Sequence, residues 1–371
     1  MHKSIHLSLA AIFLLPALAL AQESVPATQS PALAPRPAYT PVPTPTDGRI
    51  HLDVTVTDRP GKPIPGLELS DFTLKDNNLP TKILSFQAFD ASVQKDAHPA
   101  EVIILLDAVN EGFQTVARSR EGVSNFLRQN GGHLAQPVSV FAFTDAGVKV
   151  LIQPSMDGNA MAAQLDQADA GLRIIGKSAQ YGGIDRFELS LKWVAQLGKS
   201  EIKRPGRKLL IWAGPGWPLL DRVSFEMTNK EEQLLFNSIV DISTTLREAR
   251  MSLYSVSLGD PHLGTYIYQD YLKGIKTVDK AIPPDLGLKV LATQTGGRVL
   301  PPDNDLGAQI ATCVQDTSAF YAVSFDPPPA DKANEYHDLK VEIDKPGLVA
   351  RTNTGYYNQT QSPARSGGVA K

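Results

Sequence analysis

Unbroken apolar runs alternate with helical patterns through the middle of the chain. Residues 102–106, 138–143 and 209–212 have the pattern of strands buried on both faces of a parallel sheet. Shorter strands are predicted at 148–152, 253–256 and 298–300, and apolar residues at helical spacing predict helices near 116–127, 161–165, 187–197, 230–250, 286–294 and 303–315. This alternation predicts a doubly wound, Rossmann-like α/β sheet flanked by helices over residues 100–317.

Shorter, β-rich segments lie on both sides of this unit. Residues 51–57 alternate polar and apolar side chains, and many of them are β-branched, which is typical of a half-buried strand. Further strands are predicted at 72–75, 83–89, 320–325, 338–343 and 349–352, with Gly355-Tyr356-Tyr357 closing the set. We expect the segments 49–92 and 318–357 to form one small β-sandwich, into which the α/β unit is inserted.

The two ends of the chain have a different character. Residues 1–21 combine Lys3, an apolar run and the small-x-small site Ala19-Leu20-Ala21, which predicts a secretory signal peptide. An uncleaved anchor would need about 20 apolar residues, and Pro16 interrupts this run. Residues 22–48 predict a proline-rich linker, and 358–371 a disordered tail. We therefore expect an exported protein, periplasmic or secreted, with no membrane span in its mature chain.

Composition narrows the class of protein further. The 371 residues carry a net charge of −3, with no run rich in Lys and Arg, so electrostatics gives no basis for nucleic-acid binding. The single cysteine, Cys313, rules out an intramolecular disulfide and a four-cysteine metal site. Cys313 lies in a helical pattern beside Ile310 and Val314, which favours a buried core thiol over a nucleophile.

Several stretches together resemble one known family. They are 54–58, 71–74, 104–110, 204–212, 295–298 and 355–357. Taken over residues 50–357, the chain resembles the von Willebrand factor A-related domain family described from acidobacteria. The resemblance implies a von Willebrand A-like α/β domain, and by analogy a role in adhesion or assembly.

The metal-site motif of that fold is incomplete in this chain. Metal-binding A domains use Asp-x-Ser-x-Ser after the first strand, a threonine from a later loop and an aspartate after the fourth strand, because hard cations need oxygen ligands. The first motif here is 107–111, Asp-Ala-Val-Asn-Glu, the threonine position has Ile184, and the strand-end acid is replaced by Ala213-Gly214. We expect no cofactor and no bound metal, and Asp107 acting as an acceptor for the backbone of its own turn. The residues that remain as improvised ligands are Asp107, Asn110, Glu111 and Asp185.

Other sequence patterns give weaker indications of chemistry. Residues 171–178 match a phosphate-binding loop letter for letter, but they lack the preceding strand and following helix that this loop needs. Asp303-Asn304-Asp305 could suggest calcium, but capping of the next helix by Asp303 or Asn304 explains it more simply. No Gly-x-Ser-x-Gly elbow or His-x-x-x-His pair is present.

A tryptophan-rich segment is the main candidate for binding. Trp212 and Trp217 lie at the carboxyl end of a central strand, the edge where open α/β sheets bind ligands. We expect them either to contact a partner, together with Asp107 and Asn110, or to pack on the domain itself. The favoured function is a non-enzymatic module that binds an unidentified protein or cell-surface ligand. The alternatives are a Mg²⁺- or Mn²⁺-dependent adhesion module around Asp107, and a periplasmic hydrolase whose site is assembled in space.

Overall fold

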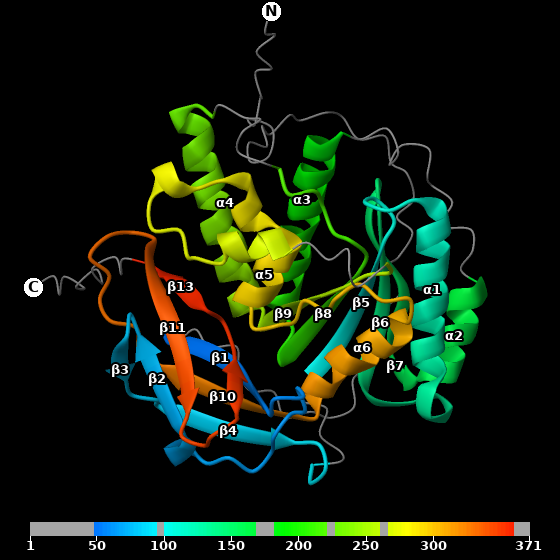
Figure 1. Ribbon diagram of the computed structural model, residues 1–371, viewed down its shortest axis with the longest axis horizontal. Coiled ribbons are helices and arrows are strands. Elements are labelled where there is room, and N and C mark those ends of the chain that lie inside the picture. Colours follow the sequence, from blue (N-terminus) through cyan, green and yellow to red (C-terminus); the bar gives the residue numbers. More distant parts are fainter. Residues whose placement is uncertain (1–47, 95–99, 168–181, 221–226, 260–265, 360–371) are drawn as a thin grey trace, which may run out of the picture.

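The computed structural model describes residues 48–94, 100–167, 182–220, 227–259 and 266–359. It confirms the predicted fold class: a parallel-dominated sheet flanked by helices, beside a sandwich of two four-stranded antiparallel sheets (Figure 1). None of the described helices is long and apolar enough to cross a membrane.

The central sheet has five strands in the order β7-β6-β5-β8-β9. Its members are β5 (Ala100–Asp107), β6 (His133–Thr144), β7 (Gly147–Asp157), β8 (Arg207–Ala213) and β9 (Met251–Val256). Four of them are parallel, while β7 returns antiparallel to β6 through a tight turn. The strand predicted at 298–300 is reduced to a single parallel bridge between Ser255 and Val299.

Helices cover both faces of this sheet. They are α1 (Phe113–Arg128), α2 (Gly158–Gln167), α3 (Gly183–Glu201), α4 (Asn229–Glu248), α5 (Leu288–Gln294) and α6 (Leu306–Val314). Ile103 and Leu105 of β5 pack in the core beneath α3, α4 and α5, whereas Ile104 and Leu106 pack in the core beneath α1, α2 and α6. Successive side chains of a strand point to opposite faces, so burial on both faces explains the unbroken apolar run.

Short helices and caps complete the unit. Single 3-10 turns lie at Leu69–Asp71, Gln129–Gly132, Tyr266–Tyr271, Val278–Lys280, Pro283–Leu286 and Gln315–Thr317. Thr228 and Glu231 form a reciprocal capping box at the start of α4. The cap of α6 is Asp305, whose carboxylate accepts from the backbone N–H of Ala308, and not the predicted Asp303 or Asn304. Asp303 instead accepts from the N–H of Asp305.

The sandwich combines strands from both ends of the described part of the chain (Figure 1, blue and orange-red). One sheet has the order β12-β1-β10-β4 and the other β13-β11-β2-β3. The strands are β1 (Ile50–Thr57), β2 (Phe72–Asp76), β3 (Leu79–Thr81), β4 (Ser85–Asp90), β10 (Ala319–Phe325), β11 (Glu335–Ile343), β12 (Val349–Arg351) and β13 (Gly355–Asn358). Because β1 pairs with β10 and β2 with β11, the sandwich is built from segments on both sides of the α/β unit.

Candidate functional site

Asp107 is the last residue of β5, at the carboxyl edge of the central sheet, and it is buried. Its Oδ1 accepts from the backbone N–H groups of Val109 at 3.1 Å and Asn110 at 2.9 Å. Its Oδ2 accepts from Asn110 Nδ2 at 2.9 Å and from the indole Nε1 of Trp212 at 2.8 Å. Both carboxylate oxygens are therefore held by neutral N–H donors of the same chain.

Burial affects both the pKa of Asp107 and the space around its side chain. Burial raises the pKa of Asp107, while hydrogen bonds from Asn110, Trp212 and Val109 oppose the rise. A Cβ placed on Gly214, which follows β8, would lie 2.6 Å from the Cβ of Asp107. Glycine at 214 thus lets the two strand ends approach each other, and a larger side chain there would displace Asp107.

The loop after Asp107 contains acceptor oxygens that are not satisfied. Asn110 donates to Asp107 and, at 3.3 Å, to the hydroxyl of Ser190 on α3. Its Oδ1 and the Oε2 of Glu111 are buried without a hydrogen-bond partner in the described structure. Burial raises the pKa of Glu111 to about 7, with a smaller contribution from the charge of Asp107 and opposition from Arg118. Glu111 is therefore a half-buried carboxyl that titrates near neutral pH.

Asp185, the fourth candidate metal ligand, accepts a hydrogen bond within its own helix terminus. It is exposed in the first turn of α3 and accepts from the N–H of Gly182 at 3.3 Å, so it satisfies an unpaired donor at the helix N-terminus. Ile184 occupies the position of the expected threonine in this turn. Within the described ranges, no group of three or more His, Cys, Asp or Glu side chains is arranged to hold a metal ion.

The two tryptophans proposed to contact a partner are buried. Trp212 is 1% exposed and Trp217 is 4% exposed, and their rings meet edge to face with centroids 5.2 Å apart. The Nε1 of Trp217 donates to the backbone carbonyl of Leu286 at 2.9 Å. In the structure Trp212, Trp217 and Asp107 are enclosed by their own domain, which is the second of the two alternatives predicted for the tryptophans, and so they offer no contact surface. Of the four candidates, Asn110 alone is partly exposed.

Other apolar side chains are exposed on the loops at this edge. Phe113, the first residue of α1, is 53% exposed, and Leu219, in the loop after β8, is 40% exposed. Phe113 lies three residues before buried Val116 and hence on the same face of the helix, but one turn further out. Sequence reasoning did not single out Phe113. Its position directly after the N-cap Gly112 was the signal that it lies beyond the end of the sheet.

Two candidates remain, the phosphate-loop pattern and Cys313. The phosphate-loop pattern at 171–178 lies outside the described residues. Cys313 is fully buried, and burial raises the pKa of its thiol, which opposes a nucleophilic role.

One histidine–carboxylate pair lies in the sandwich, where His337 Nδ1 is 2.7 Å from Asp76. The other ring nitrogen has no hydrogen-bond partner in the described structure and faces Glu335 at 3.9 Å, rather than a hydroxyl that it could activate.

Comparisons with known proteins give only distant likenesses. No protein-family model matches the chain, and no curated protein matches it. Among solved structures, human COPII-coat protein Sec24c is 11% identical with a TM-score of 0.32, and the match covers 74% of this chain and 46% of Sec24c. The SpRpn10 VWA domain is 12% identical (TM-score 0.28; 58% and 94% covered), and the TFIIH p34 N-terminal domain is 9% identical (0.29; 58% and 96%). These values are too low to carry an inference about function.

Proposed function

We propose that this chain is an exported, non-enzymatic recognition module that binds a protein or cell-surface ligand without a metal ion. The observation that carries the proposal is the environment of Asp107. Its carboxylate is buried and accepts hydrogen bonds from Val109, Asn110 and Trp212, so it already acts as a structural acceptor. Export rests on the sequence of residues 1–21.

The same environment argues against the metal-dependent alternative. Mg²⁺ and Ca²⁺ require several oxygen ligands that direct lone pairs at one point. The hydrogen-bond partners of the Asp107 carboxylate are N–H donors, which would repel a cation, and the two unsatisfied acceptors of the loop, Asn110 Oδ1 and Glu111 Oε2, do not make up a full ligand set. Asp185 already accepts a hydrogen bond at the start of α3. An acidic side chain at position 214, near where the strand-end ligand is expected, would collide with Asp107. Metal binding would require the loop after β5 to give up its hydrogen bonds.

The exposed part of this edge has the composition of a contact surface. Phe113 and Leu219 provide apolar area, and the partly exposed Asn110 and Glu111 add polar groups beside Phe113 in the sequence. Protein interfaces commonly place an aromatic side chain within a polar surround. We therefore propose that the loop between β5 and α1 is the centre of the contact face, in place of the buried tryptophans.

The hydrolase alternative finds less support. The His337–Asp76 pair lies inside the sandwich, away from the carboxyl edge of the central sheet, and Tyr356 donates to the second oxygen of Asp76 at 2.7 Å. The pair is enclosed, since His337 is 5% exposed. A catalytic triad needs a nucleophile within hydrogen-bond reach of the free ring nitrogen. We propose that this pair stabilises the sandwich.

A site-specific photocrosslinker tests the proposed face. It would be placed at position 113, and in a matched control at 349, where Val349 of the sandwich is similarly exposed at 54%. The proposal expects a partner to be crosslinked from 113 and not from 349, equally well with and without EDTA. The purified partner should then bind Phe113→Ala about tenfold more weakly than wild type, with Val349→Ala unchanged. Binding that requires a divalent cation, or that is lost only in Val349→Ala, would refute it.

A further inference from the structure

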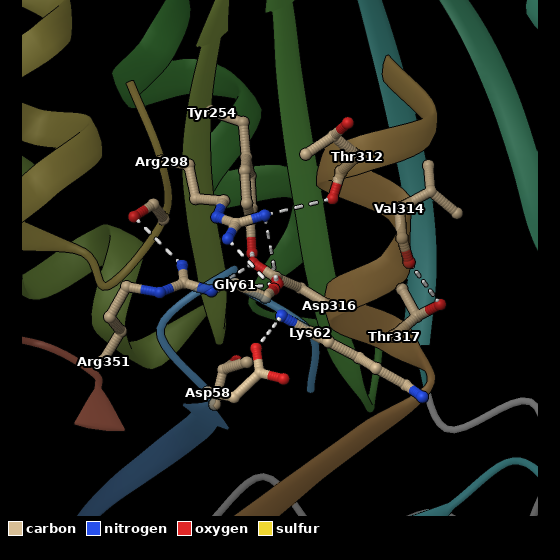
Figure 2. A network of polar contacts seen from close by, with 12 residues as sticks. Asp58, Gly61, Lys62, Tyr254, Arg298, Thr312, Val314, Asp316, Thr317 and Arg351 are labelled. Atoms are coloured by element: carbon tan, nitrogen blue, oxygen red, sulfur yellow. Dashed lines mark hydrogen bonds and ion pairs between the residues drawn. The ribbon is translucent and has the colours of Figure 1, made fainter. Parts of the chain in front are cut away.

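A buried carboxylate lies where the sandwich meets the α/β domain (Figure 2). Asp316 has no exposed surface, and both of its oxygens accept from Arg351 Nη2 at 2.8 Å. The hydroxyl of Tyr254 donates to its Oδ2 at 2.9 Å. Arg351 belongs to β12 of the sandwich, whereas Tyr254 belongs to β9 of the central sheet. One carboxylate thus binds both units.

Two more guanidinium groups extend these contacts. Arg207, at the start of β8, donates to the carbonyl of Asp316 at 3.0 Å and to the hydroxyl of Thr55 on β1 at 2.8 Å. Arg298 donates to the carbonyl of Gly61, in the turn after β1, at 3.1 Å and to the carbonyl of Thr312 on α6 at 3.3 Å. We call Thr55, Arg207, Tyr254, Arg298, Asp316 and Arg351 the junction network.

The segment 349–358 also forms hydrogen bonds with backbone carbonyls of the α/β domain. Arg351 Nη1 donates to the carbonyls of Gly296 and Gly297, at 3.2 and 3.3 Å. The N–H of Thr354 donates to the carbonyl of Gln294 at the end of α5. Gly296 has a φ of 76°, and a Cβ there would lie 2.6 Å from the Cα of Thr352. Glycine at 296 is what allows this segment to lie against the turn after α5.

A second buried ion pair lies elsewhere on the same interface. Arg250 follows the C-terminus of α4 with a φ of 52°, a left-handed conformation that usually favours glycine. Its side chain pairs with Asp53 on β1, and both side chains are less than a tenth exposed. The interface therefore contains polar contacts that are shielded from solvent and satisfied only when the two units are docked.

We infer that the sandwich and the α/β domain behave as one rigid body, and that Arg351 on β12 locks them together through Asp316. Undocking would remove the Arg351 donors from the buried carboxylate of Asp316 and from the carbonyls of Gly296 and Gly297, and would leave Asp316 with the hydroxyl of Tyr254. A ligand bound at the carboxyl edge of the central sheet would then be held at a fixed orientation to the sandwich. This inference does not depend on whether that edge binds a partner.

The positions of the tryptophans allow a direct test. All three, Trp193, Trp212 and Trp217, lie in the α/β domain, so their fluorescence reports its unfolding alone. Hydrogen exchange of β11 reports the sandwich. In wild type both probes should give the same urea midpoint. In Arg351→Met the amide exchange of β11 should become about tenfold faster than unfolding of the α/β domain allows, and its urea midpoint should fall below the midpoint given by fluorescence. This is expected for a unit released from its neighbour.

Two further variants keep the test decisive. Arg351→Lys keeps the charge but lacks the planar fork that reaches Asp316 and both glycine carbonyls, so it should separate the midpoints less than methionine does. Arg49→Met, which removes an exposed ion pair with Asp326, is the matched control and should leave the midpoints together. Separate midpoints in wild type, or equal shifts of both probes in Arg351→Met and Arg351→Lys, would overturn the inference.

Discussion

The indole Nε1 of Trp212 donates to Oδ2 of Asp107 across 2.8 Å and joins the ends of two adjacent strands, β8 and β5. The contact explains why a tryptophan is found at a strand end that carries small residues next to it. It also gives the buried carboxylate a donor that a solvent molecule or a ligand would otherwise supply. The metal-free account of this edge rests on that relationship.

Replacing Trp212 with phenylalanine should destabilise the protein more than the same change at Trp217. Both variants lose similar apolar volume, but Trp212 donates to a carboxylate and Trp217 to a neutral carbonyl. We expect costs of about 2 kcal/mol and about 1 kcal/mol beyond the lost volume. Urea unfolding at neutral pH measures the difference. Equal costs would mean that Asp107 does not depend on the indole.

Glu111 should make stability depend on pH. Its pKa rises from 4.5 to about 7 in the folded state, so the folded protein binds the proton more tightly than the unfolded chain does. The stabilisation is complete below pH 4.5 and is lost as the pH rises through about 7. Relative to wild type, Glu111→Gln should therefore gain about 1 to 2 kcal/mol between these limits, allowing for solvent screening of a half-buried group. A constant difference across that range would contradict the burial of Glu111.

Lys208 should stabilise the fold although its charge is buried. Its ammonium is buried and donates to the carbonyls of Glu201, Arg204 and Ala249, at the ends of α3 and α4. Burial lowers its pKa to about 8. Lys208→Met leaves these carbonyls unsatisfied and should cost about 3 kcal/mol of unfolding free energy.

Lys199 provides the control for this prediction. It forms an exposed ion pair with Asp241, so Lys199→Met should cost less than about 1 kcal/mol. Comparable losses in the two variants would contradict the capping role of Lys208.

Cys313 should be chemically silent in the native protein. Its thiol is fully buried on α6, and burial raises its pKa. A thiol reagent at mildly alkaline pH should react only as fast as the chain opens, and at once in denaturant. As the only cysteine, it needs no background correction. Rapid labelling of the folded protein would show that the core beneath α6 is accessible.

The sequence predicted the fold well where burial alone decides the pattern. The apolar run of β5 and the alternation in β1 each follow from how many faces of a strand are covered. Resemblance and spacing also located Asp107 at a strand end. Smaller details were not predicted, such as the cap of α6 by Asp305, because the neighbouring Asp303 and Asn304 fit that role equally well in sequence.

The failures concern the direction of side chains and contacts between distant segments. A tryptophan near the end of a buried strand can point inward or outward. The direction of the Trp212 side chain depends on Asp107, which lies more than a hundred residues earlier. Thr55, Arg207 and Asp316 are each more than a hundred residues apart in the chain, and Arg351 follows Asp316 by 35 residues, so no local pattern indicates the junction network. The exposed Phe113 was not predicted as a contact residue, because one apolar residue ahead of a helical pattern gives no sign of its exposure.

Thermal unfolding with EDTA, and then with millimolar Mg²⁺, Mn²⁺ or Ca²⁺, tests the central claim most directly. A ligand that binds only the native state raises the melting temperature once its concentration exceeds its dissociation constant. We predict that the melting temperature of wild type is the same in EDTA and with each ion. The same should hold for Asp107→Asn, although this variant melts at a lower temperature than wild type. A rise with any ion in wild type that Asp107→Asn abolishes would make Asp107 a metal ligand and contradict the account.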